Sequence, residues 1–140
     1  MSCLETCATL RIFSDDVTPH VIMKTLDIEP TDSFARDDPY NRGRNRRKMH
    51  GWFWSTESKV ISTDNAEHVR AIIEKLAGKQ QALHRLAVMG CRIDISNYWV
   101  SSGQGGPILE PDKMRVLAEM GIAIWWDVYF GQDKDYAEPR

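Results

Sequence analysis

The sequence lacks any apolar run that approaches the length of a membrane-spanning helix, which needs about 20 consecutive apolar residues. Its first residues, Met1-Ser2-Cys3-Leu4-Glu5-Thr6, also lack the basic region followed by an apolar region that marks a secretory signal. The first absence argues against a membrane-spanning helix, and the second argues against secretion. We therefore expect the chain to stay in the cytoplasm.

Cysteine is scarce, with three residues at Cys3, Cys7 and Cys91. An odd number in a chain without a signal predicts reduced thiols. Cys3 and Cys7 are four residues apart near or on a predicted strand, which separates their Cα atoms by roughly 13 Å, too far for a disulfide. Their spacing fits no zinc pattern, and no histidine pair lies beside them. We expect structural thiols, with neither a metal nor a cofactor.

The short motifs that carry catalysis are also missing. The four histidines are scattered, and none forms an i, i+4 metal-binding pair or an H-E-x-x-H motif. There is no G-x-S-x-G and no phosphate-binding glycine loop that ends in Lys-Ser or Lys-Thr. A formal net charge of −2 predicts no general attraction to nucleic acid. These absences favour a protein that is not an enzyme.

What the sequence does contain is a clear helix–strand unit from Pro111 to Phe130. Pro111 suits a first helical turn, apolar residues follow at helical spacing, and Gly121 suits the left-handed position that ends a helix. The apolar residues then alternate, and one face of the strand carries Ile122, Ile124, Trp126, Val128 and Phe130. The other face carries Ala123, Trp125, Asp127 and Tyr129. The first face predicts contact with a core, and the second predicts partial exposure.

The remaining elements are predicted from periodicity and capping residues. Thr18 before Pro19, and Asp64 three residues before Glu67, are good helix N-caps. Apolar residues at helical or alternating spacing predict, in chain order, segments at 4–13, 19–26, 51–56, 65–76, 82–89 and 91–99. The first, third and sixth of these are strands, and the others are helices.

This order predicts an α+β fold with a four-stranded, mainly antiparallel sheet built from two β-α-β units of the ferredoxin-like, split β-α-β type. The units would interleave, with the first and third strands central and an extra helical pair between the units. We expect a single domain over residues 1–140, because this length suits one core and not two. Within it we expect a long basic loop at 27–50 and a C-terminal tail at 131–140.

Alternation along the predicted strands places aromatic and charged side chains together on the sheet face opposite the helices. These residues are Arg11, Phe13, Trp52, Trp54, Arg92, Asp94, Tyr98, Trp125, Asp127 and Tyr129. Aromatic residues and arginine are enriched at interfaces, so this face is a candidate binding surface. The alternative is that the 27–50 loop or the helical pair covers the face, so that the rings form a second small core.

Binding of single-stranded RNA is a second hypothesis. Exposed rings on such a sheet stack with bases, and a basic loop binds phosphates. The cations of that loop are Arg42, Arg44, Arg46, Arg47 and Lys48. The negative net charge argues against this function, and a solvated loop also explains the basic residues.

A small-molecule site or weak hydrolase on the sheet face is a third hypothesis. It requires Asp94 and Asp127 to lie on neighbouring strands as an acid–base pair with a deep pocket between them. The alternative for these two carboxylates is ordinary surface pairing with Arg11 and Arg92.

Several stretches resemble a known family. They are Leu10-Arg11-Ile12-Phe13-Ser14-Asp15-Asp16, Ile28-Glu29-Pro30-Thr31, Gly51-Trp52-Phe53-Trp54-Ser55, Leu117-Ala118-Glu119-Met120-Gly121-Ile122 and Asp127-Val128-Tyr129. Together they are similar to the bacterial proteins classed as domain of unknown function 4279, over nearly the whole chain. The resemblance implies a single-domain bacterial cytoplasmic protein and supplies no activity and no catalytic residue. By analogy, small domains of this kind serve as immunity or partner-binding proteins.

The combined prediction is a non-enzymatic domain that recognises a protein partner through the aromatic and charged sheet face and the basic loop. The prediction requires the aromatic and charged side chains of all four strands to point to the same side of the sheet, as the alternation along each strand predicts. RNA binding and a small-molecule site are the alternatives. The sequence does not predict an oligomeric state.

Overall fold

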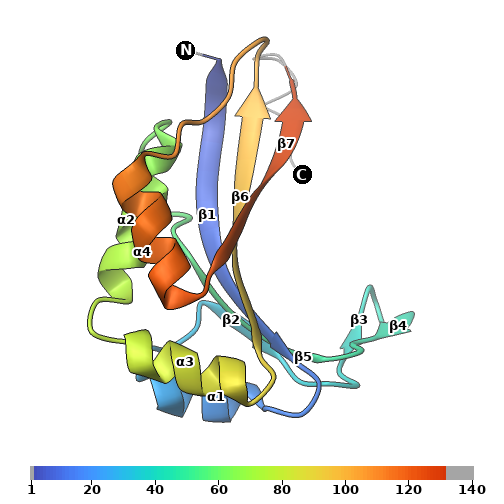
Figure 1. Cartoon of the computed structure of the whole chain (residues 1–140). Helices are drawn as coiled ribbons and strands as arrows, with labels where there is room; N and C mark the ends of the chain where they lie inside the picture. The colour runs from blue at the N-terminus through green and yellow to red at the C-terminus, as the bar shows by residue number, and fades with distance from the viewer. Residues whose placement is uncertain (1, 132–140) are drawn as a thin grey trace.

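The computed structural model describes residues 2–131, and it consists of a curved sheet with helices on one of its faces (Figure 1). The elements in chain order are β1 (Cys3–Ser14), α1 (Pro19–Leu26), β2 (Asp32–Phe34), β3 (Pro39–Tyr40), β4 (Asn45–Arg46), β5 (His50–Ser55), α2 (Asn65–Lys75), α3 (Gln80–Val88), β6 (Arg92–Ser101), α4 (Pro111–Met120) and β7 (Ala123–Phe130). Five strands form one sheet in the order β2-β5-β1-β6-β7, and β3 pairs with β4 separately.

Strand β1 is the centre of the sheet. It pairs antiparallel with β5 on one side and with β6 on the other. β6 and β7 are parallel neighbours. Parallel neighbours need a crossover connection, and α4 supplies it between these two strands. The sheet is therefore mixed, with antiparallel pairing through its centre and one parallel pair at its edge.

The α+β class, the extra helical pair (α2 and α3) and the central position of the first and third long strands are confirmed. The ferredoxin-like arrangement is not matched. The two units lie side by side instead of interleaving, the last pair of strands is parallel, and β2 adds a fifth strand. Hydrophobic periodicity fixes which face of a strand is buried but not which strand lies next to it, so the sequence could not decide between these topologies.

The predicted helix ends are confirmed by their capping contacts. The Thr18 hydroxyl accepts a hydrogen bond from the Val21 amide, and Pro19 is the first residue of α1. The Asp64 carboxylate accepts one from the Ala66 amide at the start of α2. Gly121 ends α4 with a φ of 72°. None of the helices in residues 2–131 has the length and apolar character needed to cross a membrane.

The core lies between the sheet and the helices. Leu10 and Ile12 of β1 and Ile95 of β6 are fully buried there. Ile72 of α2 and Leu83 of α3 pack into the same cluster. Each buried side chain of this size stabilises the fold by about 1.5–3 kcal/mol relative to an exposed one. The apolar face of each helix therefore packs against the same side of the sheet.

A buried polar network fastens α2 to three strands. The Asn65 amide nitrogen donates to Thr6 Oγ1 (3.1 Å) and to Asn97 Oδ1 (2.9 Å). The Asn65 amide oxygen accepts from Trp126 Nε1 at 2.9 Å. Asn97 in turn donates to the main-chain oxygen of Trp125 at 3.0 Å. One asparagine therefore joins β1, β6 and β7 to the start of α2.

A second buried contact holds the connection between β5 and α2. His68 lies within hydrogen-bonding distance of the Ser62 carbonyl (Nε2, 2.8 Å) and of Thr56 Oγ1 (Nδ1, 2.6 Å). The Thr56 hydroxyl and amide also bond to the main chain of Ala8. His68 is buried, so this histidine is a structural residue that positions the loop.

The segment 27–50, predicted as a loop, contains three short strands. β2 pairs with β5, and β3 and β4 form a small hairpin that projects from the sheet (Figure 1). The prediction was wrong because strands of two or three residues are too short to give a periodic signal. Of the predicted tail at 131–140, Gly131 donates to the Ser101 carbonyl, and residues 132–140 lie outside the described part of the chain.

The apolar face of β7 meets the core only along its first half. Ile122 and Ile124 pack against the core, as predicted. In the part of the chain that the structure describes, Val128 is 42% exposed and Phe130 is 80% exposed. The helices do not reach the C-terminal end of β7, which explains why alternation predicted too large a core there (Figure 1).

Candidate functional site

Strand register decides which side chains share the sheet face opposite the helices, which we call the outer face. Residues paired directly across two strands point to the same face. Arg11 pairs with Asp94, Tyr98 with Asp127, and Val100 with Tyr129. The register places these predicted residues together on the outer face: Arg11, Phe13, Arg92, Asp94, Tyr98, Trp125, Asp127 and Tyr129.

The centre of the outer face is an ion pair between Arg11 and Asp94. Arg11 Nε donates to Asp94 Oδ1 at 2.8 Å, and Nη2 donates to Oδ2 at 2.7 Å. The guanidinium carbon lies 5.1 Å from the Phe13 ring centroid and 5.3 Å from that of Trp125. Two parallel charge-assisted bonds and two neighbouring rings hold the guanidinium in one orientation. The pair is a fixed polar centre between aromatic side chains.

The two carboxylates proposed for a hydrolase do not form a pair. Asp127 pairs with Tyr98, which is four residues beyond Asp94, so the two Cα atoms are separated by roughly 13 Å along the strands. Both oxygens of Asp94 are occupied by Arg11. Asp127 accepts a hydrogen bond from the Tyr129 hydroxyl at 3.0 Å. This arrangement offers no adjacent acid and base.

One end of the outer face carries an aromatic cluster, of which only Phe13 was predicted to lie there. Phe13 and Phe53 meet edge to face with centroids 5.4 Å apart, and Phe34 and Phe53 do so at 5.6 Å. Phe34 lies on β2 opposite Gly51. The absence of a side chain at Gly51 makes room for the Phe34 ring, because a Cβ there would come within 2.3 Å of it.

We expect Gly51→Ala to lower the free energy of unfolding by about 1–3 kcal/mol, because the added methyl group displaces Phe34 and β2 with it. Urea denaturation measures the change. Gly103→Ala is the matched control, since a Cβ at that position meets nothing within 4 Å. Equal stabilities of the two variants would contradict the packing of Phe34 over Gly51.

Trp52 and Trp54 were predicted on the outer face, and this is wrong. Trp52 pairs with Ile12 and Trp54 with Leu10, so both indoles point to the helix side. Trp52 is fully buried, and its Nε1 is the one buried side-chain nitrogen or oxygen among the described residues without a hydrogen-bond partner. In Trp52-Phe53-Trp54 aromatic residues occupy both alternating faces of the strand. Alternation therefore could not decide which ring points to the outer face.

The other end of the outer face is open. Trp125 is 42% exposed and Tyr129 is 49% exposed. The Tyr98 and Tyr129 rings lie side by side with centroids 5.3 Å apart. The segment 27–50 contacts the outer face at the Phe53 end, through β2 and through Met49, whose Sδ accepts from Arg92 Nη2 at the start of β6 (3.1 Å). It leaves Trp125 and Tyr129 exposed on β7 (Figure 1). The interpretation of the face as a second closed core therefore fails at β7.

The predicted basic loop residues lie on the β3–β4 hairpin and the chain beside it. We call residues 36–48 the basic hairpin. Arg47 lies between two rings, 4.0 Å from the Phe34 centroid and 4.2 Å from that of Tyr40. Arg46 donates to the main-chain oxygen of Asp37 at 3.3 Å. These two cations therefore make contacts within the hairpin and between the hairpin and β2.

The remaining cations of the predicted set, Arg42, Arg44 and Lys48, are exposed, and within residues 2–131 their side chains make no hydrogen bond or ion pair. Asn41, Arg42 and Gly43 at the tip have φ values of 54°, 57° and 80°. A tight hairpin turn requires this left-handed conformation, which asparagine and glycine adopt most readily.

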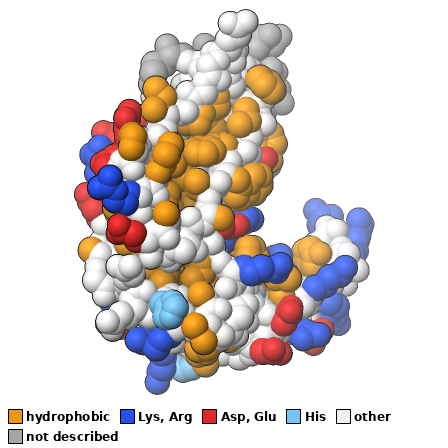
Figure 2. All heavy atoms as spheres, viewed as in Figure 1, with side chains coloured by type: hydrophobic (Ala, Val, Ile, Leu, Met, Phe, Trp, Pro, Cys, Tyr) orange, Lys and Arg blue, Asp and Glu red, His pale blue; other side chains and the backbone are white. Residues whose placement is uncertain are grey.

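Charge is unevenly distributed in the chain. Residues 36–48 contain six Lys or Arg and two Asp, a formal charge of +4, which leaves −6 for the rest of the chain. Figure 2 shows blue Lys and Arg side chains on the projecting hairpin and a hollow between the hairpin and the body of the sheet. The hairpin therefore presents a local positive field beside the aromatic outer face.

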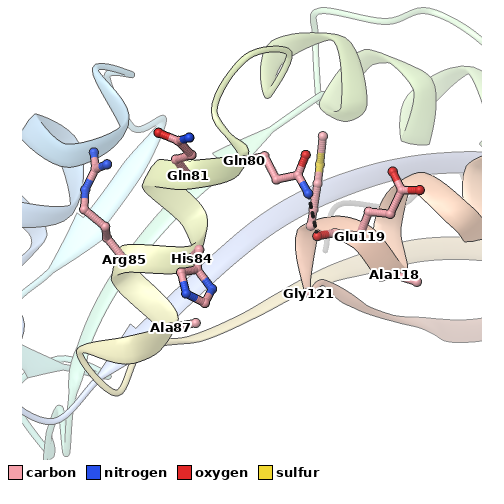
Figure 3. Close-up of a pocket in the computed structure, with 9 residues that line it drawn as sticks. Gln80, Gln81, His84, Arg85, Ala87, Ala118, Glu119 and Gly121 are labelled. Carbon is pink, nitrogen blue, oxygen red and sulfur yellow. Dashed lines mark hydrogen bonds between the residues drawn. The ribbon is translucent and has the colours of Figure 1, made fainter.

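A cavity of about 720 Å³ lies between α3 and α4 on the other side of the molecule (Figure 3). Gln80 reaches across it and donates to the Glu119 carbonyl at 3.1 Å, and His84 points into the space. Arg85 and Gln81 also line it. The lining is mixed and polar, and it contains no nucleophile paired with a base.

Two of the three thiols, those of Cys3 and Cys91, are buried. Burial raises the pKa of Cys3 and the pKa of Cys91, which disfavours the nucleophilic thiolate. No disulfide links the three cysteines, all of which the structure describes. Among the described residues, no group of three or more His, Cys, Asp or Glu is placed to hold a metal ion.

The fold and the outer face define a small α+β protein with a curved mixed sheet, helices on one face, and an aromatic and charged face on the other. The chain belongs to the family described as Domain of unknown function (DUF4279), whose family model matches residues 4–131. Neither the curated proteins nor the solved structures contain a match to this chain. The predicted family resemblance is therefore confirmed, and it carries no activity with it.

Proposed function

We propose that this protein is a non-enzymatic binding domain that recognises a protein partner through the outer face and the basic hairpin. The observation that carries the proposal is the exposure of Trp125 and Tyr129 on the outer face, where Trp125 lies next to the Arg11–Asp94 pair. The hairpin with unpaired cations lies at the Phe53 end of the same face. Exposed aromatic residues and arginine dominate the binding energy of protein interfaces. A rigid strand surface also holds them at little entropic cost on binding.

The partner that fits best is an acidic protein surface with an apolar centre. Arg42, Arg44 and Lys48 supply positive charge at the rim, and rim charges of this kind accelerate association and select against basic partners. The exposed aromatic side chains of the outer face supply the apolar contact. Because the rest of the chain is acidic, the hairpin is the part that attracts such a partner.

We expect the double charge reversal Arg42→Glu/Arg44→Glu to reduce partner capture from a native-host lysate by at least about tenfold, because a rim attraction becomes a repulsion. The control is Arg70→Glu/Arg115→Glu, which changes the net charge by the same amount on exposed helix positions. Quantitative mass spectrometry of the captured proteins is the measurement. Equal loss with both variants, or with neither, would contradict a role for the hairpin.

Single-stranded RNA is the second candidate, favoured by the unpaired cations of the hairpin and by the exposed rings of Trp125 and Tyr129 on the outer face. It is weaker because Asp127 lies between those rings on the outer face and repels phosphates. Binding of mixed oligonucleotides that weakens with salt would support it. No binding at low salt would exclude it.

We also propose a bacterial cytoplasmic setting and, more narrowly, an immunity-type role. Three cysteines without a disulfide, two of them buried, suit a reducing compartment. A toxin gene next to the gene for this chain, and co-purification of its product, would support the immunity role. A neighbourhood without such a gene would leave the general partner-binding proposal in place and remove this refinement.

A further inference from the structure

Strand β7 is an edge of the sheet. It pairs with β6 on one side, and within residues 2–131 no strand pairs with its other side. The opposite edge strand, β2, is three residues long, whereas β7 is eight residues long. Proteins usually shorten an edge strand, or place lysine, proline or a bulge in it, because an open edge pairs with other chains. β7 contains no lysine or proline, and its register with β6 has no shift.

The hydrogen bonds to β6 show which main-chain groups of β7 face the open edge. The Gly131 amide donates to the Ser101 carbonyl at 2.9 Å, so the main chain of Gly131 faces β6. The Trp125 carbonyl faces the same way, because it accepts from the Asn97 side chain at 3.0 Å. Successive residues of a strand direct their main-chain groups to opposite edges. The N–H and C=O groups of the even-numbered residues, Ile124 to Phe130, therefore face away from β6.

The side chains of these even-numbered residues point to the helix side, as the bond from Trp126 Nε1 to Asn65 shows. The helices leave the last part of the strand uncovered, so Val128 and Phe130 are exposed. Figure 2 shows hydrophobic side chains gathered over β7. Exposed apolar surface next to a free strand edge indicates a contact with another chain.

The strand is complementary to a second copy of itself. In an antiparallel pair centred on Val128, the two Val128 side chains lie opposite each other, and Phe130 lies opposite Trp126 of the second copy. The most exposed side chain of each copy therefore meets an aromatic ring of the other. On the outer face, the same register places the Tyr129 hydroxyl near Asp127 of the second copy.

Charge and burial disfavour the neighbouring registers. Asp127 is the one charged residue of β7, and a pair centred on it would place two carboxylates directly opposite each other, which is destabilising. A pair centred on Trp126 would place Phe130 opposite Ile122, whose side chain is buried beneath the helices and cannot cover the ring. A pair centred on Val128 avoids both faults.

We propose that β7 pairs antiparallel with β7 of a second copy, centred on Val128, and that the two five-stranded sheets join into one continuous sheet. The pairing has two-fold symmetry, so it uses both long open edges and closes at two copies. The short strand β2 is then the edge at each end. The two outer faces become one surface, on which each Trp125 lies opposite Gly131 of the other copy and keeps its indole uncovered.

The dimer does not depend on the proposed recognition of a partner through the outer face. Pairing uses the main-chain edge of β7 together with Val128 and Phe130 on the helix side. Partner recognition uses Trp125 on the outer face and the basic hairpin. A variant that stays monomeric and still captures the partner would separate the two proposals, so failure of either leaves the other in place.

The test uses the full-length protein in sedimentation equilibrium between about 1 μM and 1 mM, with hydrogen exchange read by NMR at both ends of this range. We expect a monomer–dimer equilibrium and slower exchange of the Trp126, Val128 and Phe130 amides in the dimer. The Asp127 and Tyr129 amides face β6 in both states, so their exchange should change little. Slower exchange at Ile124 in place of Phe130 would indicate the register centred on Trp126 and contradict the proposed pairing.

The variant Val128→Lys is expected to weaken dimerisation at least about tenfold, because it places two cations opposite each other at the centre of the pair. Val88→Lys makes the same change at an exposed position of α3 and is expected to dimerise as the wild type does. Circular dichroism checks that both variants are folded, and the exchange measurement on the wild type does not depend on them.

Three results would overturn the proposal. The first is a monomer at about 1 mM, which would leave the edge to a different partner. The second is dimerisation that Val128→Lys leaves unchanged. The third is protection of the even-numbered amides that does not vary with protein concentration, which would show that residues 132–140 of the same chain occupy the edge.

Discussion

Replacing Asn65 by alanine is expected to lower the free energy of unfolding by about 3 kcal/mol or more. The wild-type amide donates to Thr6 and Asn97 and accepts from Trp126. Its removal leaves Asn97 Oδ1 and Trp126 Nε1 without these partners in a site where water has little access, because both asparagines are buried. Each such group costs about 1–3 kcal/mol.

Urea denaturation followed by tryptophan fluorescence measures this change. The matched control is Asn45→Ala, which removes a hydrogen bond between two exposed side chains and is expected to cost less than about 0.5 kcal/mol. A loss below about 1 kcal/mol for Asn65→Ala would show that α2 is not fastened to the sheet through this network.

The second large effect is expected on binding. Trp125→Ala combined with Tyr129→Ala should weaken capture of the protein partner about thirtyfold or more, because exposed aromatic residues at the centre of an interface commonly contribute about 2 kcal/mol or more. Both side chains are nearly half exposed, so their removal should change stability little. Trp125 also loses its contact with Arg11, but the two hydrogen bonds from Arg11 to Asp94 keep that guanidinium in place.

The matched control removes exposed apolar side chains from the helix side of the molecule. Val88 and Met114 are 74% and 52% exposed, and Val88→Ala/Met114→Ala removes exposed apolar side-chain atoms from α3 and α4. It should capture the partner as the wild type does. If both double variants lose the partner to the same degree, non-specific hydrophobic adsorption explains the capture, and the outer face does not.

The predicted helices and their ends were right where a local signal exists. Thr18, Asp64 and Gly121 occupy the cap positions that their side chains or backbone freedom favour. The side chains of β1, β6 and β7 that face outward were also predicted correctly, because each strand has one clearly more apolar face. This orientation brings Arg11, Asp94 and Trp125 together.

The errors arose where the signal is not local. Trp52-Phe53-Trp54 is aromatic at every position, so only the pairing with Leu10 and Ile12 decides that Phe53 faces out. The parallel neighbours β6 and β7 follow from the crossover through α4, which alternation does not encode. Phe34 could have been found from Gly51, since a glycine inside a strand indicates a close neighbour.

The central claim is that a partner binds the outer face. Photocrosslinking in the native host tests it most directly, with p-benzoylphenylalanine placed in turn at positions 125 and 114, both exposed and on opposite faces of the molecule. We predict that position 125 forms one dominant adduct with a protein and that position 114 forms none. The same adduct from position 114, or none from position 125, would contradict the claim.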